Sequence, residues 1–247
     1  MCFLAILYKA VDDYPVVVGA NRDEFLYRPG TPPLEIAPGV WAGADPRAGG
    51  TWLGLNEHGV ICGVTNRGDE AARIVGARSR GLLCLETLKA ASTALARQTI
   101  EQEHADFQFN DFNLLVANRD DAFAARSVQG RLQFDLLTPG LHILGNTTLD
   151  NLDESKVRRG FEIIDNPSTI ERAISIFTTA CRDHGAAGDC SDAICVHARQ
   201  YGTLSSTIIA VHAGDNRLNR YLHAPANPCS SEYQDLWSSL SPLQHLR

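Results

Sequence analysis

Hydrophobic positions gather along this chain in short runs that are separated by turn residues, the pattern of a strand-rich protein. We predict strands at residues 3–8, 16–20, 52–55, 60–64, 112–117, 122–128, 132–137, 141–144, 207–212 and 218–222. Short turns join neighbouring runs at residues 12–13, 56–59, 118–121, 129–130 and 214–216. Because turns of this length connect antiparallel strands, the pattern predicts antiparallel sheets.

A helical spacing of apolar residues occurs in two places, residues 82–97 and residues 154–182. The second region is interrupted near Asn166 and Pro167, and Ser168 with Glu171 is the pattern of a capping box that begins a new helix. Helices this few among so many strands predict an α+β fold of antiparallel sheets flanked by helices. We find no linker, repeat or low-complexity segment, so we expect a single domain over residues 1–247.

Composition and charge narrow the class of protein. The formal net charge is -7, which is contrary to the basic surface that nucleic-acid binding requires. No apolar run approaches the roughly 18 residues of a membrane-spanning helix, and the start of the chain lacks the pattern of a signal peptide. Seven cysteines without a regular spacing are typical of reduced thiols. We therefore expect a cytoplasmic protein that has no transmembrane segment and binds no nucleic acid.

Cysteine and histidine residues also raise the question of a metal site. Cys181 and His184 are three residues apart, and Cys190, Cys195 and His197 follow closely. Their spacing is irregular and no second CxxC pair is present, whereas zinc sites usually have regularly spaced ligands that include such pairs. From the sequence alone we expect neither a metal nor a cofactor.

Cys2 directly follows the initiator methionine at the start of the first predicted strand. Removal of Met1 before a small residue would leave a cysteine with a free α-amine, whose pKa is about 7.7–8.0, beside a thiol of pKa about 8.5. One residue would then supply a nucleophile and a base. The alternative is that Cys2 is simply a small apolar residue that packs in the core.

Four polar residues, Asn21, Arg22, Asp23 and Glu24, stand at the end of the second predicted strand. If the first two strands form a hairpin, these residues lie level with the N-terminus. Asp23 or Asn21 would then orient the α-amine, and Arg22 would favour a thiolate or bind an anionic substrate group. The tetrapeptide ANRD recurs at residues 117–120, where we expect an ordinary hairpin turn.

The order of longer motifs is more specific. The chain contains, in sequence, MC, GANRDEFLYRP, GGTWLGLNEHGVICGVTNR, RSRG, FNLLVANRD, GLHILGN and YGTLSST. This series resembles the NRDE family, also called the transport and Golgi organisation protein 2 family, which looks like a branch of the N-terminal nucleophile hydrolase superfamily. The resemblance implies a four-layer αββα sandwich and a nucleophile at the start of the first strand. It also implies acyl transfer at an amide or related bond outside a peptide chain.

Further site residues follow from the resemblance. Asn66 and Asn146 resemble the asparagines that bile-salt and penicillin amidases keep as donors to the oxyanion, although each is equally consistent with an asparagine that caps a turn. Two positions depart from the pattern. Leu204 replaces a common arginine, so we expect a cation to be missing there, and Gly145 stands where many relatives have serine.

Two functions from different classes remain open. The first is an N-terminal-cysteine hydrolase that acts on a small-molecule amide or related acyl compound. The second is a non-catalytic carrier or chaperone, since eukaryotic members of the family are linked to haem trafficking and to acyl-lipid or acyl-CoA handling. The carrier alternative leaves the NRDE motif and Cys2 unexplained. A purely structural or interaction protein, which predicts neither thiol reactivity nor ligand binding, ranks last.

Overall fold

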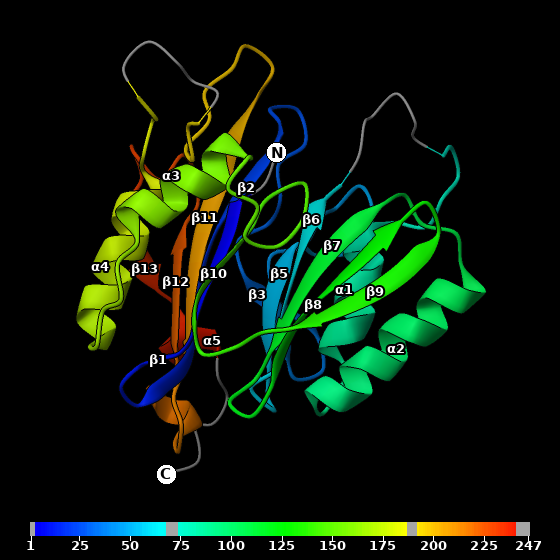
Figure 1. Cartoon of the computed structure of the whole chain (residues 1–247), viewed down its shortest axis with the longest axis horizontal. Coiled ribbons are helices and arrows are strands. Elements are labelled where there is room, and N and C mark those ends of the chain that lie inside the picture. Colours follow the sequence, from blue (N-terminus) through cyan, green and yellow to red (C-terminus); the bar gives the residue numbers. More distant parts are fainter. Residues whose placement is uncertain (1–2, 68–73, 187–191, 241–247) are drawn as a thin grey trace. The chain divides into compact units, whose positions relative to one another are not determined.

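The structure is a computed structural model that describes residues 3–67, 74–186 and 192–240. The chain divides into two compact units. Unit 1 comprises Met1–Pro29, Pro139–Gly145 and Leu149–Arg247, and unit 2 comprises Gly30–Thr138 and Asn146–Thr148. Each unit contains its own antiparallel sheet (Figure 1). The assignment of the whole chain to a single domain stays a prediction.

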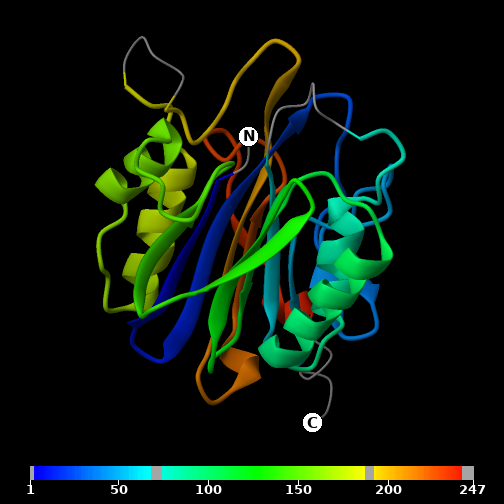
Figure 2. The ribbon, with the colours of Figure 1, turned by 45° about the vertical axis from the view of Figure 1, so that its right-hand side comes forward.

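Unit 1 is built on a six-stranded sheet with the order β10-β1-β2-β11-β12-β13. Its strands are β1 (Phe3–Val11), β2 (Tyr14–Phe25), β10 (Gly140–Leu144), β11 (Tyr201–Val211), β12 (Arg220–Ala224) and β13 (Gln234–Asp235). Its helices are α3 (Ser155–Ile163), α4 (Ile170–Cys181), α5 (Trp237–Leu240) and the short 3-10 helix η2 (Asn216–Leu218). Figure 2 shows α3 and α4 lying along one face of this sheet.

The core of unit 1 forms between that face and the two helices. Phe3 and Leu7 from β1 and Val17 from β2 are buried against Val157 of α3 and Phe177 of α4. Because side chains alternate across a strand, the odd-numbered residues at positions 3–7 of β1 and 17–23 of β2 point toward these helices. This alternation decides which polar residues of β2 reach α3.

Unit 2 is built on a seven-stranded sheet that follows the chain order from β3 to β9. Its strands are β3 (Leu34–Ala37), β4 (Val40–Ala42), β5 (Leu53–Asn56), β6 (Ile61–Asn66), β7 (Phe112–Ala117), β8 (Ala122–Val128) and β9 (Arg131–Leu136). Helices α1 (Arg80–Leu88) and α2 (Thr93–Asp106) contribute Leu83, Leu88 and Ile100 to its core. All neighbouring strands of this sheet are antiparallel.

The α+β class and its antiparallel sheets are confirmed, and the five predicted hairpin turns join antiparallel neighbours. The predicted helix at 82–97 is wrong in extent, because Ser92 caps a separate helix by accepting a hydrogen bond from the Leu95 N–H. The break after α3 is confirmed. The predicted cap is wrong by one residue, since the Thr169 hydroxyl, rather than Ser168, accepts from the Arg172 N–H.

Among the helices of the described residues, none combines the length and the apolar composition needed to cross a membrane.

Candidate functional site

The NRDE motif lies inside strand β2, which continues to Phe25 instead of ending at residue 20. Phe3 pairs with Asn21, so the hairpin places the motif level with the start of β1, as predicted. On its other side β2 pairs with β11, where Asp23 faces Thr203 and Asn21 faces Ser206. The motifs GANRDE and YGTLSST are therefore neighbours in the sheet. Cys2 lies outside the described residues.

Asp23 is a buried polar residue of this region. One carboxylate oxygen, Oδ1, accepts a hydrogen bond of 2.6 Å from the Thr203 hydroxyl. The other, Oδ2, lies 2.8 Å from Nζ of Lys156, and the two side chains are 0% and 3% exposed. The Tyr201 hydroxyl donates to the backbone carbonyl of Asp23 at 2.9 Å. Asp23 is thus a carboxylate that is held in place by a buried cation and a buried hydroxyl.

Lys156 was not among the residues predicted from the sequence. It lies in the first turn of α3, where it is buried with Val157 and Gly160. Lys156, Gly160 and Ile164 recur at four-residue steps, and a lysine on such an otherwise apolar helix face is the signal that would have identified it. Its partner is 133 residues away in the sequence, which is why the pairing itself could not be predicted.

Leu204 occupies an irregularity of β11. The register against β2 shifts between Thr203 and Ser205, so Leu204 is the additional residue of a β-bulge. The expectation that a cation is missing at position 204 stays a prediction as regards substrate binding or the thiol. No cation stands at position 204, yet α3 supplies Lys156 to the neighbouring Asp23.

Asn21 and Arg22 are also buried, and both have structural contacts. The Asn21 side-chain amide donates to the carbonyl oxygens of Cys181 and Ile194, each at 2.9 Å, so it ties β2 to the end of α4 and the segment that follows. Its Oδ1 atom has no donor among the described residues. Nη1 of Arg22 donates to the Arg28 carbonyl at 3.1 Å.

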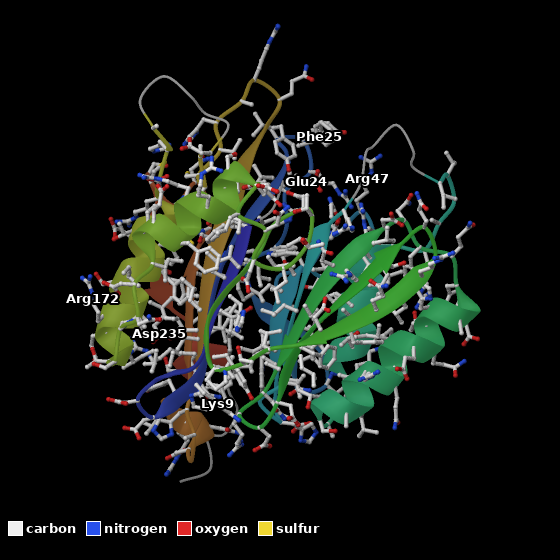
Figure 3. The ribbon with its side chains drawn as sticks, in the orientation of Figure 1. Lys9, Glu24, Phe25, Arg47, Arg172 and Asp235 are labelled. Carbon is white, nitrogen blue, oxygen red and sulfur yellow. The ribbon has the colours of Figure 1, made fainter. Side chains whose placement is uncertain are left out.

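Arg22 points to the opposite face of the sheet from Asn21 and Asp23, because consecutive side chains alternate. Glu24 and Phe25 complete β2 (Figure 3), and Glu24 forms an ion pair of 3.0 Å with Arg28. The side chains of the NRDE motif thus lie on both faces of the sheet. Asn21 and Asp23 point toward the helices of unit 1, and Arg22 does not.

Asn66 and Asn146 meet in unit 2. Asn66 ends β6, and its backbone carbonyl accepts a hydrogen bond of 2.5 Å from Nδ2 of Asn146. Their role as oxyanion donors stays a prediction. A side chain at Gly145 would begin 2.2 Å from the Glu154 carboxylate, which therefore fills the space of a serine at that position in this chain.

The second copy of the tetrapeptide is a hairpin turn, as predicted. The Asn118 side-chain oxygen accepts from the backbone N–H groups of Asp120 and Asp121, at 2.9 and 2.8 Å. The tetrapeptide ANRD therefore lies within a strand at residues 20–23 and forms a turn at residues 117–120. At residues 20–23 the strand β2 is paired with neighbouring strands on both sides.

Unit 1 also contains a cluster of imidazoles and thiols. One potential ligand atom from each of His184, Cys195, His197 and Cys229 lies within 4.8 Å of the others. Three of these residues were considered in the sequence, but Cys229 was missed because it is 32 residues beyond His197. Cys181 does not join the cluster; it is fully buried, and burial raises the pKa of its thiol to about 11. Cys190 lies outside the described residues.

Similarity to known proteins extends over more than half of the chain in each case. A sequence model described as Transport and Golgi organisation 2 matches residues 1–220. The Transport and Golgi organization protein 2 homolog of Bos taurus is 25% identical over 242 residues, covering 81% of this chain and 83% of that protein. The Mus musculus homolog is 29% identical over 149 residues, covering 56% of this chain and 52% of that protein.

Among solved structures, penicillin V acylase from Agrobacterium tumefaciens has a TM-score of 0.56 at 12% identity, covering 92% of this chain and 83% of its own. The Caenorhabditis elegans ortholog of N-acylethanolamine-hydrolyzing acid amidase has a TM-score of 0.53 at 8% identity, covering 94% and 98%. These similarities confirm the N-terminal nucleophile hydrolase fold. At such identities they show the fold alone.

Proposed function

Because the chain belongs to the Transport and Golgi organisation 2 family and has the fold of N-terminal nucleophile hydrolases, we propose that it is a hydrolase whose nucleophile is Cys2. Its substrate would be a small molecule that contains a non-peptide amide or a related acyl bond. Both solved neighbours are named for action on N-acyl compounds, and this supports the choice of substrate class.

The observation that carries the proposal is the buried carboxylate of Asp23. Phe3, the residue after Cys2, pairs with Asn21, and Asp23 is two residues further along the same strand. Lys156 and Thr203 both donate hydrogen bonds to this carboxylate. A carboxylate is an acceptor through both of its oxygens, which is the kind of group that orients an α-ammonium.

The proposed reaction begins once Met1 is removed. The Cys2 thiol transfers its proton to its own α-amine, and the sulfur attacks the substrate carbonyl carbon to form a tetrahedral intermediate. The α-ammonium then protonates the leaving amine, the carbon–nitrogen bond breaks and an acyl-thioester forms. Water, deprotonated by the α-amine, hydrolyses this thioester, which releases the acid and restores the thiol.

Each further residue has a distinct role in this proposal. Asp23 positions the α-amine and stabilises its protonated form. Asn66 and Asn146 are the proposed amide donors to the oxyanion, for which preorganised N–H groups are required. Arg22 is the proposed cation for the thiolate or for an anionic part of the substrate. The neutral amide of Asn21 secures the strand through its two carbonyl contacts.

A panel of N-acyl amides that includes penicillin V and N-acylethanolamines tests the proposal. We expect untagged protein to hydrolyse at least one member and Cys2→Ala to abolish this turnover with an unchanged melting temperature. The matched control retains Cys2 behind an N-terminal extension that cannot be removed. It keeps the thiol but places the α-amine in a peptide bond, so it should also be inactive.

Turnover that survives in Cys2→Ala, or that is unchanged in the extended protein, would exclude this mechanism. A chain that hydrolyses no member of the panel but shifts the absorbance of added haem, or binds acyl-CoA, would instead be a carrier.

A further inference from the structure

We infer that His184, Cys195, His197 and Cys229 form a binding site for one Zn²⁺ ion. The four residues come from three segments of unit 1, the stretch after α4, the stretch before β11 and the stretch after β12. Their potential ligand atoms lie within 4.8 Å of one another. None of the four has a role in the proposed hydrolysis.

The distances inside the cluster agree with a tetrahedral site. Zinc–sulfur bonds of about 2.3 Å and zinc–nitrogen bonds of about 2.0–2.1 Å place sulfur and nitrogen ligands about 3.6 Å apart in a tetrahedron. Nε2 of His197 lies 3.6 Å from Sγ of Cys195 and 3.3 Å from Sγ of Cys229. The ring centroids of His184 and His197 are 5.1 Å apart. Small side-chain movements are therefore enough to bring all four atoms to one ion.

The donor set selects the kind of metal. Two sulfur and two nitrogen donors are typical of structural zinc sites, whereas magnesium and calcium require oxygen donors. With four protein ligands the ion would have no open coordination position, so we infer a structural site and not a catalytic one. Three of the four residues are exposed and Cys195 is buried, which leaves solvent access for the ion.

Contacts that do not involve the four side chains already hold the three segments together. Arg182, at the end of α4, donates through Nε to the Pro228 carbonyl at 2.8 Å. The Cys195 N–H donates to the Asp183 carbonyl at 2.7 Å. The scaffold is thus preorganised around the cluster, which lowers the conformational cost of binding an ion.

Thr203 links this scaffold to Asp23. Its hydroxyl accepts from the Val196 N–H at 2.9 Å and donates to Oδ1 of Asp23, while its carbonyl accepts from the Asn227 side chain at 2.7 Å. Val196 lies between two of the proposed ligands, and Asn227 is two residues from Cys229. An ion at the cluster would therefore brace the segments that hold Asp23 in position.

Metal titration of the full-length protein tests the inference. The protein is stripped with a chelator under a reductant, and zinc is added in competition with a chromophoric chelator. We expect one equivalent to bind and to raise the melting temperature. Co²⁺ in place of zinc should give the absorption spectrum of a tetrahedral ion with thiolate ligands. Cys229→Ser, a change at an exposed position, should weaken zinc binding at least about tenfold.

His58→Ala is the matched control, because His58 is an exposed histidine outside the cluster. This variant should bind zinc as the wild type does. Sub-stoichiometric zinc, an octahedral cobalt spectrum, or unchanged affinity in Cys229→Ser would each overturn the inference. So would a reduced protein that binds no zinc and forms a Cys195–Cys229 disulfide in air. These readouts do not use turnover, so they are independent of the proposed hydrolysis.

Discussion

The side chains of Asp23 and Lys156 place opposite charges in the interior of unit 1, where each depends on the other. Removing one partner of such a pair leaves an uncompensated buried charge, which is far more costly than the loss of an exposed ion pair. The Thr203 hydroxyl satisfies a further site of the carboxylate. The pair therefore fixes the carboxylate that the proposed mechanism requires.

Lys156→Met should lower the free energy of unfolding by about 3–5 kcal/mol, because Asp23 would remain buried without its cation. Urea unfolding measures this effect. Lys89→Met is the matched control, since Lys89 pairs with Glu86 on an exposed helix surface and should contribute less than about 1 kcal/mol. Adding Asp23→Asn to Lys156→Met should recover part of the loss. Equal stability of Lys156→Met and Lys89→Met would contradict this account of the pair.

Because of His223, we expect the free energy of unfolding to decrease in mild acid. It is buried, its Nδ1 lies 3.0 Å from the Thr207 hydroxyl, and burial lowers its pKa to about 4. The unfolded chain has a histidine pKa of about 6.5, so between these two values the unfolded state binds more protons. The free energy of unfolding should therefore fall as the pH decreases from 6.5 toward 4.

The contribution of His223 between pH 7 and pH 5 is on the order of 2 kcal/mol. His223→Gln removes the titrating group, and its stability should decline less over this interval. Chemical unfolding of both proteins at the two pH values measures the difference. Identical pH dependence in the two proteins would show that His223 does not contribute to the acid sensitivity.

The spatial position of a site residue could be predicted from the sequence where it depends on the pairing of two strands that are consecutive in the chain. The hairpin of β1 and β2 follows from residues adjacent in sequence, so the position of Asn21 and Asp23 near the start of β1 was predictable. Lys156 and Cys229 could not be assigned, because their partners are brought to them by the packing of distant segments. The pattern of residues within one segment of the sequence does not indicate such a contact.

At the scale of elements, hydrophobic alternation predicted β7 and β8 with their observed bounds. It failed for β3, β4 and β13, which have two to four residues and carry too few positions for a pattern. Hydrophobic alternation also predicted that β2 ends at residue 20, because the residues that follow are polar. The pairing of β2 with β1 and β11 outweighs the low strand propensity of asparagine and aspartate there.

The contact between β2 and α4 depends on the absence of a side chain at Gly19. A Cβ atom there would lie 2.6 Å from Cδ1 of Phe177, which is fully buried. Gly19→Ala should therefore destabilise the protein by about 1–3 kcal/mol through overpacking. Thermal or urea unfolding measures this. Gly214→Ala, where nothing lies within 4 Å, should be nearly neutral, and equal effects of the two changes would contradict the packing.

For the whole molecule, the antiparallel sense of consecutive strands follows from the many short turns of the sequence, whereas the expectation of two stacked sheets came from the family resemblance. The order of motifs identified the family, and the match over residues 1–220 confirms it. The cluster of His184, Cys195, His197 and Cys229 was not predicted, because its spacing along the chain matches no familiar metal motif. Its members come from the stretches after α4, before β11 and after β12, so no single segment of the sequence contains them all.

The most direct test of the central claim is the intact mass of the untagged protein, quenched in acid during turnover of an amide that it hydrolyses. We expect a mass without Met1, together with a second species that carries the acyl group, which peptide mapping places on Cys2. Retention of Met1 in the active protein would contradict the claim, since the α-amine of Cys2 would then be part of a peptide bond. An acyl group on any other residue would contradict it equally.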